Sequence, residues 1–338
     1  MRSLLNVQKK LVPDLFDVMT KRYRILQYIR LMEPIGRRSL ASSLDITERV
    51  LRSEVSFLKE QGLLDIAPQG MSLTKEGNYL FHHLEEVMKE ISGLKALEEA
   101  LKKRLQLSEV IVVPGDSDEA SWVKKEMGRF AVAILKARLK NQAVIAVTGG
   151  TTLAAVAEMM TPEPRLELLF VPARGGLGEQ VENQANTICA KMASKAMGDY
   201  RLLHVPDQLS EEAYQSLIAE PNVKERLELI QSARMVIHGI GEANTMAVRR
   251  KSSQKVQDKI AESEAVAEAF GYYFDQEGKV VHKVKTIGLQ LDDLEKCETV
   301  IAVAGGTSKA NAIDAYMKRG PKSILVTDEG AAKALLRE

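Results

Sequence analysis

The hydrophobic pattern of the chain changes near residue 110. Before that point, apolar residues recur at spacings of three and four, which is typical of amphipathic helices. After it, short apolar runs alternate with helical stretches. The runs predict strands at residues 110–113, 144–147, 166–171, 201–205, 235–237, 300–303 and 323–326. Such alternation predicts a Rossmann-like α/β domain: a mostly parallel sheet covered by helices, with ligands at the carboxyl ends of the strands.

The region before residue 60 predicts a helix-turn-helix. A long amphipathic helix is expected from Asp14 to Met32, then a short helix at 37–44 and a second one at 48–59, with Thr47 as its cap. In the last of these, Val50, Leu51, Val55 and Leu58 are expected to face the core. Its other side presents basic and hydroxyl side chains, as does a helix that enters the major groove of DNA.

A hairpin and a local excess of positive charge favour DNA binding. Residues 63–67 and 71–74 flank a turn at 68–70 and predict the wing of a winged helix. Between residues 21 and 59 there are nine Lys or Arg against four acidic residues, although the net charge of the chain is only +1. We expect DNA contacts from Arg37, Arg38, Thr47, Arg49, Arg52, Ser53, Ser56 and Lys59. The alternative is a winged helix that docks a protein.

The next segment is a helical connector. Leucine and other apolar residues continue at spacings of three and four from Leu84 to Leu105, with charged residues between them. This heptad-like seam predicts either a coiled-coil dimer contact or a helix that lies on its own domain. The dimer is favoured because helices that read DNA grooves usually act in two-fold pairs. Gly93 weakens the helix locally and marks a candidate hinge.

Two strand-turn-helix segments contain a pair of glycines followed by hydroxyl residues. They are Gly149, Gly150, Thr151 and Thr152, and then Gly305, Gly306, Thr307, Ser308 and Lys309. Glycines let backbone N–H groups approach a ligand, and the helix that follows directs unpaired N–H groups at the turn, so each suits a phosphate. Such turns also join strands to helices for steric reasons alone. Their recurrence predicts a ligand with two anionic ends, or one cleft lined from two sides.

Further loops after predicted strands add cations and amides. Arg174, Gly175 and Gly176 follow one strand, and a guanidinium group suits phosphate because it can donate two parallel hydrogen bonds. Arg249 is a second candidate, with surface charge as the alternative for it and for Arg250. The candidate amides are Asn183, Gln184 and Asn186.

An aromatic stretch at residues 264–274 is expected to belong mostly to the core. The turn at 275–278 that follows it leads to Val280, Val281 and His282, which predicts an antiparallel excursion from the main sheet. Within the aromatic stretch, Glu268 is either an acceptor for sugar hydroxyls or a solvated helix acid.

Several carboxylates could serve as a general base if the large domain were an enzyme. They are Asp116, Asp118, Glu179, Glu242, Glu268 and Asp328. No Ser/His/Asp order, metal-ligand pair or HExxH motif accompanies them. We therefore expect binding of a phosphorylated sugar without turnover, with no cofactor and no metal. The alternative is an isomerase-like or deaminase-like enzyme that carries a DNA-binding appendage.

Composition agrees with a two-domain intracellular protein. The chain has 338 residues, 45% of them hydrophobic, which is enough for a large core. Cys189 and Cys297 are far apart in sequence and predict neither a disulfide nor a zinc framework, which favours a reducing cytoplasm. No signal-peptide core or membrane-spanning run is visible.

At this point the sequence resembles a known family. The motifs are EPIGRRSLASSLDITERVLRSEV at 33–55, VTGGTT at 147–152, PARGG at 172–176, HGIGEA at 238–243, VAGGTSK at 303–309 and VTDEGAA at 326–332. Together they look like the SorC family of bacterial sugar-responsive transcription regulators, and more narrowly its members that repress glycolytic genes. The resemblance covers the whole chain.

The resemblance implies a regulator rather than an enzyme. It implies a sensor domain related to sugar-phosphate isomerases and glucosamine-phosphate deaminases, a tetramer that holds operator DNA, and fructose-1,6-bisphosphate as the inducer that weakens DNA binding. It implies effector contacts from both glycine turns and from Arg174, Gly175 and Gly176, with Gln184, Arg249 and Glu268 as further contacts. The expected domains are residues 1–83 for DNA binding, 84–106 as the connector and 107–338 for effector binding.

Overall fold

The computed structural model of the protein describes residues 11–176, 180–320 and 323–337. The chain forms two compact units, which divide between Ala96 and Leu97. The predicted domain limits at residues 83 and 106 stay predictions. Within the described ranges, no helix combines the length and the apolar character that crossing a membrane requires.

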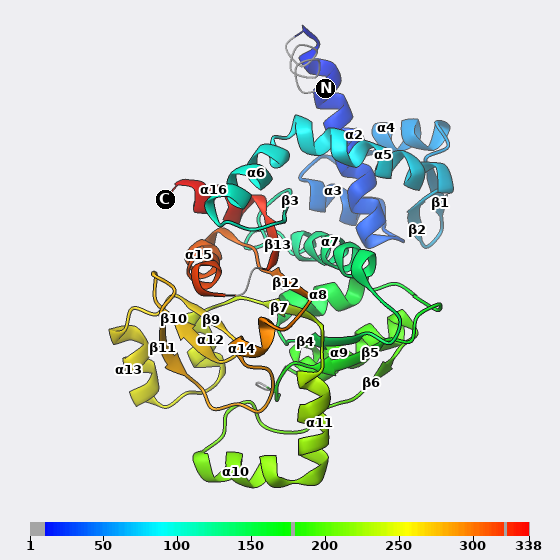
Figure 1. The fold of residues 1–338 in the computed structure, drawn as a ribbon. Coiled ribbons are helices and arrows are strands. Elements are labelled where there is room, and N and C mark those ends of the chain that lie inside the picture. The colour runs from blue at the N-terminus through cyan, green and yellow to red at the C-terminus, as the bar shows by residue number, and fades with distance from the viewer. Residues whose placement is uncertain (1–10, 177–179, 321–322, 338) are drawn as a thin grey trace. The chain divides into compact units, whose positions relative to one another are not determined.

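The first unit is the predicted winged helix. It contains α2 (Pro13–Met32), α3 (Arg37–Leu44), α4 (Glu48–Glu60), the antiparallel strands β1 (Leu64–Ala67) and β2 (Gly70–Leu73), and α5 (Lys75–Ile91), drawn blue to cyan in Figure 1. The turn between α3 and α4 ends at Thr47, whose hydroxyl accepts a hydrogen bond from the N–H of Val50 at 3.3 Å. Thr47 therefore caps α4, as predicted.

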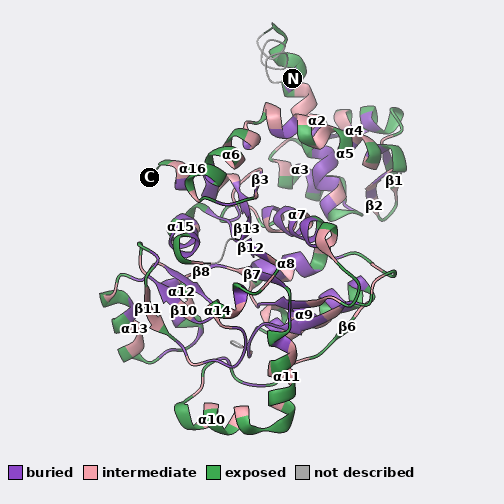
Figure 2. Cartoon of the chain, viewed as in Figure 1, coloured by how far each residue is buried: buried purple, intermediate pink, exposed green. Residues whose placement is uncertain are grey.

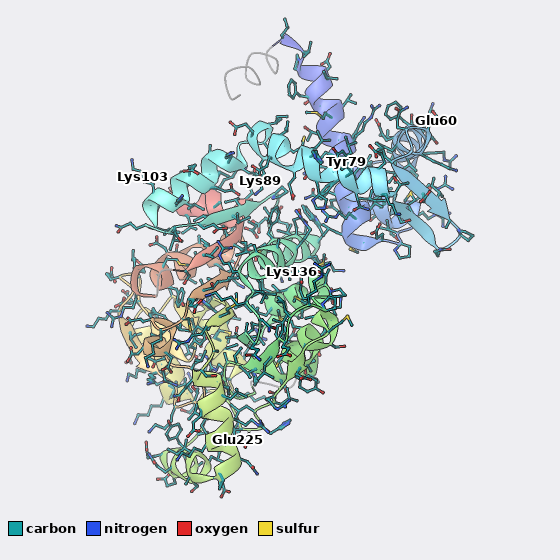
Figure 3. The ribbon with its side chains drawn as sticks, turned by 45° about the vertical axis from the view of Figure 1, so that its right-hand side comes forward. Glu60, Tyr79, Lys89, Lys103, Lys136 and Glu225 are labelled. Carbon is teal, nitrogen blue, oxygen red and sulfur yellow. The ribbon has the colours of Figure 1, made fainter. Side chains whose placement is uncertain are left out.

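Helix α4 buries one side and exposes the other. Leu51, Val55 and Leu58 are buried at helical spacing. The prediction that Val50 joins them is wrong, because Val50 lies off this stripe and is 42% exposed. Glu54 forms ion pairs with Lys21 and Arg22 of α2 at 2.5 and 2.9 Å, which attaches α4 to the long helix. Figure 3 labels Glu60 at the end of α4, where the side chain is exposed.

The connector consists of two helices rather than one. Helix α5 ends at Ile91, and α6 (Leu94–Arg104) begins after a break at which Gly93 has φ +79°. Glycine adopts this left-handed backbone without the steric cost that other residues incur, so it ends the first helix. The predicted local weakness at Gly93 is confirmed, and the continuous seam from Leu84 to Leu105 is not formed. The dimer contact stays a prediction.

The second unit is built on a seven-stranded sheet in which every pairing is parallel. Its strands are β3 (Val110–Val113), β4 (Val144–Val147), β5 (Leu169–Pro172), β6 (Asp199–Tyr200), β7 (Met235–Gly239), β12 (Thr299–Val303) and β13 (Ile324–Asp328). Their order is β3-β13-β12-β7-β4-β5-β6. The predicted α/β architecture is therefore confirmed.

Helices cover this sheet and supply its core. Helices α7 (Trp122–Arg138), α8 (Thr151–Met159) and α9 (Ala185–Ala196) share one apolar cluster with the central strands, and Figure 2 shows these strands in the colour of buried residues. Helices α15 (Ala310–Arg319) and α16 (Glu329–Arg337) follow β12 and β13. Between β6 and β7 lie α10 (Glu211–Ala219) and α11 (Pro221–Gln231), and α14 (Leu291–Leu294) precedes β12. The 3-10 turns are η1 (Val181–Asn183), before α9, and η2 (Thr307–Lys309), before α15. Figure 3 labels the exposed Glu225 on α11.

A smaller antiparallel sheet confirms the predicted excursion. It contains β8 (Gly241–Glu242), β9 (Ala267–Ala269), β10 (Tyr272–Phe274) and β11 (Val280–Lys283), in the order β11-β10-β9-β8. Helices α12 (Ala243–Arg249) and α13 (Gln254–Glu262) pack beside it around a small apolar cluster. Phe270, Tyr273 and Phe274 are buried, as predicted for the aromatic stretch. Glu268 lies on strand β9 and is buried, so the alternative of a solvated helix acid is wrong.

The strand predicted at 201–205 is not formed. The edge strand of the sheet is instead the short β6, which ends at Tyr200. Beyond it, the side chain of Asn186 exchanges two hydrogen bonds with the backbone of Leu203, at 2.9 and 3.2 Å. A side-chain amide thus replaces the ladder that the apolar run suggested.

Candidate functional site

The carboxyl ends of four parallel strands surround one pocket of the second unit. It encloses about 780 Å³ of empty space, its open mouth included. Segments that follow β4, β5, β7 and β12 line it, as expected for this type of sheet. The lining residues are 148–153, 174, 175, 183–185, 207, 239–241, 246, 249, 250, 268–270 and 309.

The first glycine turn lies open on the pocket wall. Gly150 has φ +122°, and no heavy atom beyond its chain neighbours lies within 4 Å of the place where a Cβ would stand. Its N–H donates to the carbonyl of Asn183 at 2.8 Å, which fixes the turn. Helix α8 begins at Thr151 without a side-chain cap, so the N–H groups of its first turn point at the pocket without a helical partner. Gly149 and the buried Thr152 also line the pocket at this turn.

Two arginines and two carboxylates from four separate segments form a buried cluster that also lines the pocket. We call it the quartet, and its members are Arg174, Asp207, Arg250 and Glu268. Arg250 donates through Nε to Asp207 Oδ2 at 2.9 Å and through Nη2 to Glu268 Oε1 at 2.7 Å. Arg174 donates through Nη1 to Glu268 Oε1 at 3.3 Å and also forms an ion pair with Asp207. The quartet therefore carries no net charge of its own.

Burial and pairing act in opposite directions on the quartet. Burial by itself raises the pKa of Glu268, but the charges of Arg250 and Arg174 outweigh it and hold that pKa below its usual range. Burial by itself lowers the pKa of Arg250, yet the nearby carboxylates of Glu268 and Asp207 raise it overall. Arg250 and Glu268 thus keep each other ionised.

Two further cations line the pocket outside the quartet. Arg249, at the end of α12, is exposed, and Lys309 follows the second glycine turn. Within the described part of the chain, neither forms an ion pair within 4 Å. Burial, then the neighbouring Lys124, lowers the pKa of Lys309, whereas Asp118 acts to raise it. Because the quartet is neutral, Arg249 and Lys309 supply the positive charge that remains for an anionic ligand.

The second glycine turn differs from the first, against expectation. Of its residues only Lys309 lines the pocket, whereas Gly305, Gly306, Thr307 and Ser308 do not. Their polar groups are occupied by carboxylates of the chain itself. Gly306 N–H donates to Asp328 at 2.7 Å, Thr307 Oγ1 to Asp116 at 2.6 Å and Ser308 N–H to Asp118 at 2.8 Å. The cause is topological: β13 and β3 lie beyond β12 in the sheet, and their ends carry these acids.

The other predicted ligand contacts divide between the pocket and its surroundings. Gly175, Asn183 and Gln184 line the pocket. Gly176 does not, and its N–H donates to the carbonyl of Val205 at 3.0 Å. Asn186 is occupied by Leu203, as described above.

The carboxylates considered as general bases are already engaged where the structure describes them. Asp116, Asp118 and Asp328 bind the second turn, Glu268 belongs to the quartet, and Glu242 caps α12 by accepting from the N–H groups of Asn244 and Thr245 at 2.9 and 2.7 Å. Glu179 lies outside the described residues. This arrangement suits a binding pocket.

Sequence reasoning missed two members of the quartet. Asp207 sits in an irregular loop after β6 and has no motif around it. Arg250 was treated as surface charge together with Arg249, but it is 8% exposed and donates to Tyr273 Oη at 2.8 Å as well as to both carboxylates. The short helix α12 ends between these neighbours, so adjacent arginines point in different directions. Helical periodicity would have distinguished the buried Arg250 from the exposed Arg249 only if the end of α12 at Arg249 had been known from the sequence.

The winged-helix unit exposes all eight residues predicted to contact DNA. Thr47, Arg49, Arg52, Ser53, Ser56 and Lys59 lie on or just before α4, and Arg37 and Arg38 open α3. Gly36, Arg37, Arg38, Ser39, Glu48 and Arg52 together line a concave surface between the starts of α3 and α4. This surface is basic apart from Glu48, which pairs with Arg38 at 3.4 Å.

Comparison with known proteins agrees with this division. A family model described as a sugar-binding domain matches residues 89–337, and one described as the CggR N-terminal DNA-binding domain matches residues 18–88. A central glycolytic genes regulator from Priestia megaterium is 65% identical over all of this chain and 99% of its own length. One from Bacillus subtilis is 62% identical over the full length of both chains.

Solved structures show the same fold. A SorC family transcriptional regulator from Enterococcus faecalis has a TM-score of 0.68 and 48% identity, covering 71% of this chain and 99% of its own. The full-length sorbitol operon regulator SorC from Klebsiella pneumoniae, at 19% identity, has a TM-score of 0.68 and covers 94% of this chain and 98% of its own.

Fold and site thus define a transcription regulator, in which a winged-helix DNA-binding unit precedes a sugar-binding α/β unit. The relatives are named as regulators rather than enzymes, in agreement with the engagement of the candidate general bases by other groups of the chain. Within this class, the chain belongs to the SorC family and, in it, to the central glycolytic genes regulators.

Proposed function

We propose that the protein is a repressor of glycolytic genes that binds operator DNA and is released from it by a phosphorylated sugar, most specifically fructose-1,6-bisphosphate. The observation that carries the proposal is the pocket. An open glycine turn at Gly150 and two cations outside the quartet, Arg249 and Lys309, meet in one cavity. The relatives at 62% and 65% identity are named as regulators of central glycolytic genes, which supports glycolytic genes as the target of this protein.

The chemistry of the pocket supports a sugar with phosphate groups. A bisphosphate carries about four negative charges near neutral pH, since the second pKa of a phosphate monoester is about 6. N–H groups of a helix start and two cations suit such charges. Glu268 and Asp207 also line the pocket, and their carboxyl groups are candidate acceptors for the hydroxyl groups of the sugar.

The proposed assembly is a homo-oligomer, from dimer to tetramer, with DNA bound through α4. A single recognition helix covers only one half-site, and a two-fold partner covers the second one. Effector binding changes the affinity for DNA only if the effector binds one arrangement of the subunits better than another.

Fluorescence anisotropy on the promoter upstream of the protein's own gene tests this function. The full-length protein is titrated with and without fructose-1,6-bisphosphate, and with fructose-6-phosphate at the same concentration as the control. We expect tight binding that the bisphosphate loosens and the monophosphate does not. Tight binding that no sugar phosphate alters would refute the effector, and binding without salt dependence would refute the DNA-binding role.

A further inference from the structure

The second unit, called the sensor unit from here on, contains two glycine turns with the same sequence pattern. The space next to the first turn is empty, and the space next to the second is occupied. At Gly150 the place of a missing Cβ is empty. At Gly306, with φ +98°, the same place is occupied by the carboxylate of Asp118, whose nearest oxygen would lie 2.4 Å from a Cβ. A carboxylate thus stands where a bound anion would stand over the second turn. The position for an anion over the first turn is open, and the corresponding position over the second turn is occupied by a carboxylate of the chain itself.

The carboxylates that bind the second turn come mainly from one loop. Residues 114–121 connect β3 to α7 and contain Asp116 and Asp118. Asp116 accepts from Thr307 Oγ1 at 2.6 Å and from the N–H of Asp118 at 2.8 Å, and Asp118 accepts from the N–H of Ser308 at 2.8 Å. Asp118 is exposed, whereas Asp328, which holds the N–H of Gly306, is buried. Asp118 is therefore the member of this group that can leave without opening the core.

The residue next to Ser308 reaches the effector pocket. Lys309 lines that pocket, while the preceding N–H is held by Asp118. Asp118 also interacts with the charge of Lys309, so an effector phosphate that meets Lys309 competes with this carboxylate for the same cation. A phosphate at Lys309 and the carboxylate of Asp118 repel each other, because both are negative and both lie near this cation.

We propose that Asp118 is an internal competitor of the effector phosphate: it sets the affinity of the pocket, and an effector bound at Lys309 displaces it from Ser308. This inference rests on the proposed function and names the residue that regulates its site. Displacement of Asp118 breaks its link to Ser308 while Asp116 still holds Thr307, so the part of the loop around Asp118 has one position without effector and another with it.

The position of this loop matters because helix α6 contacts both β3, which precedes the loop, and α15, which follows the second turn. Glu98 of α6 accepts a hydrogen bond from the N–H of Val112 on β3 at 3.0 Å. Arg104 of α6 forms an ion pair at 3.4 Å with Asp314 on α15, the helix that follows the second turn. Opening of the contact between Asp118 and Ser308 thus acts on the two elements that hold α6, and α6 is the segment through which the chain continues to the DNA-binding unit.

The chain carries a reporter for this movement. Its single tryptophan, Trp122, begins α7 directly after the loop, and its ring lies 3.2 Å from the Cβ position of Gly115 at the loop's start. Intrinsic fluorescence of the full-length protein therefore reports on the loop. Titration calorimetry with fructose-1,6-bisphosphate reports on the affinity in the same samples.

The test compares Asp118→Ala with Glu119→Ala, because Glu119 is an exposed acid of the same loop and its loss changes the net charge equally. We expect Asp118→Ala to bind the bisphosphate about five- to tenfold more tightly than the wild type. Its effector-free fluorescence should resemble that of the effector-bound wild type, and Asp118→Asn, which keeps one acceptor, should be intermediate. Glu119→Ala should behave as the wild type does.

Equal or weaker effector binding by Asp118→Ala than by Glu119→Ala would overturn the proposal, since a competitor that is removed must leave the site tighter. A wild-type protein that does not bind the bisphosphate would instead refute the proposed effector. The two failures are thus distinguishable. Thermal unfolding of each variant shows whether the loop change has affected the fold.

Discussion

Arg250 and Glu268 are joined inside the sensor unit by a hydrogen bond of 2.7 Å between Nη2 and Oε1. The same carboxylate oxygen accepts from the N–H of Gly271 at 2.6 Å, so a single atom connects the end of α12 to the turn between β9 and β10. Both side chains are almost fully buried. The wall of the effector pocket therefore depends on ionic contacts that water does not screen.

Replacement of Glu268 by Gln should destabilise the protein strongly. The substitution keeps the size of the side chain but leaves two buried arginines with the single carboxylate of Asp207. We expect the free energy of unfolding to fall by about 3 kcal/mol, measured by urea denaturation. Glu262→Gln, at an exposed position of α13, should stay within about 0.5 kcal/mol of the wild type. Similar stabilities of the two variants would contradict the quartet's role.

The adjacent arginines should give opposite phenotypes. Arg249→Ala removes an exposed cation of the pocket, so effector affinity should fall about tenfold with little change in stability. Arg250→Ala leaves Asp207 and Glu268 without their shared partner, and the free energy of unfolding should fall by roughly 3 kcal/mol. Calorimetry and denaturation on both variants separate the two roles. An exchange of these phenotypes would show that the ligand contact comes from Arg250.

Acidification should weaken the fold through His238. Burial lowers the pKa of this side chain to about 4, from an ordinary value of 6.5. The unfolded chain therefore takes up a proton below pH 6.5, while the folded protein does not do so until about pH 4. The stability that neutral His238 contributes is complete above pH 6.5 and is lost as the pH falls to 4, by roughly 3 kcal/mol in total.

Urea denaturation at several pH values between 7 and 4 measures this loss. His238→Asn should show a flatter dependence, whereas His204→Asn, at an exposed position, should keep the slope of the wild type. His238 contacts the carbonyl of Gly239 at 3.0 Å and the hydroxyl of Tyr316 at 3.2 Å, so the variant also loses some stability at pH 7. An unchanged slope in His238→Asn would assign the loss to other groups.

Arg52→Ala should weaken operator binding without affecting the sensor. Its side chain is exposed on α4 and lines the concave basic surface with Arg37 and Arg38. If it meets a phosphate, the affinity should fall about tenfold, and the slope of log affinity against log salt should decrease by about one. Lys296→Ala removes an exposed charge of the sensor unit and should leave both quantities unchanged. Bisphosphate affinity should be normal in both variants.

Much of the architecture could be predicted because it follows from local pattern. The limits of α3 and of β3 and β4 agree with the apolar runs, and Thr47 caps α4 as its side chain requires. The first glycine turn was recognisable because its sharp bend between strand and helix needs glycine, as the φ of +122° at Gly150 shows. Periodicity failed at residues 201–205. There the backbone of Leu203 takes its hydrogen bonds from the side chain of Asn186 instead of from a neighbouring strand.

The state of the second turn could not be predicted from its own sequence. Its glycines and hydroxyl residues repeat those of the first turn, and the difference lies in Asp116 and Asp118, almost two hundred residues earlier in the chain. Their meeting depends on the order of strands β3, β13 and β12, which no local pattern specifies. Asp207 and Arg250 were missed for a similar reason, because the quartet is assembled from separate loops.

The neutrality of the quartet has a genetic consequence. Loss of one carboxylate leaves a surplus buried positive charge, and loss of one arginine leaves a surplus negative one. A second substitution that removes the opposite charge should therefore restore folding, so Asp207→Asn should be suppressed by Arg174→Met. A selection for revertants of a quartet mutant should return such compensating changes within the same four positions, and the family should exchange these residues in pairs of opposite charge rather than one at a time.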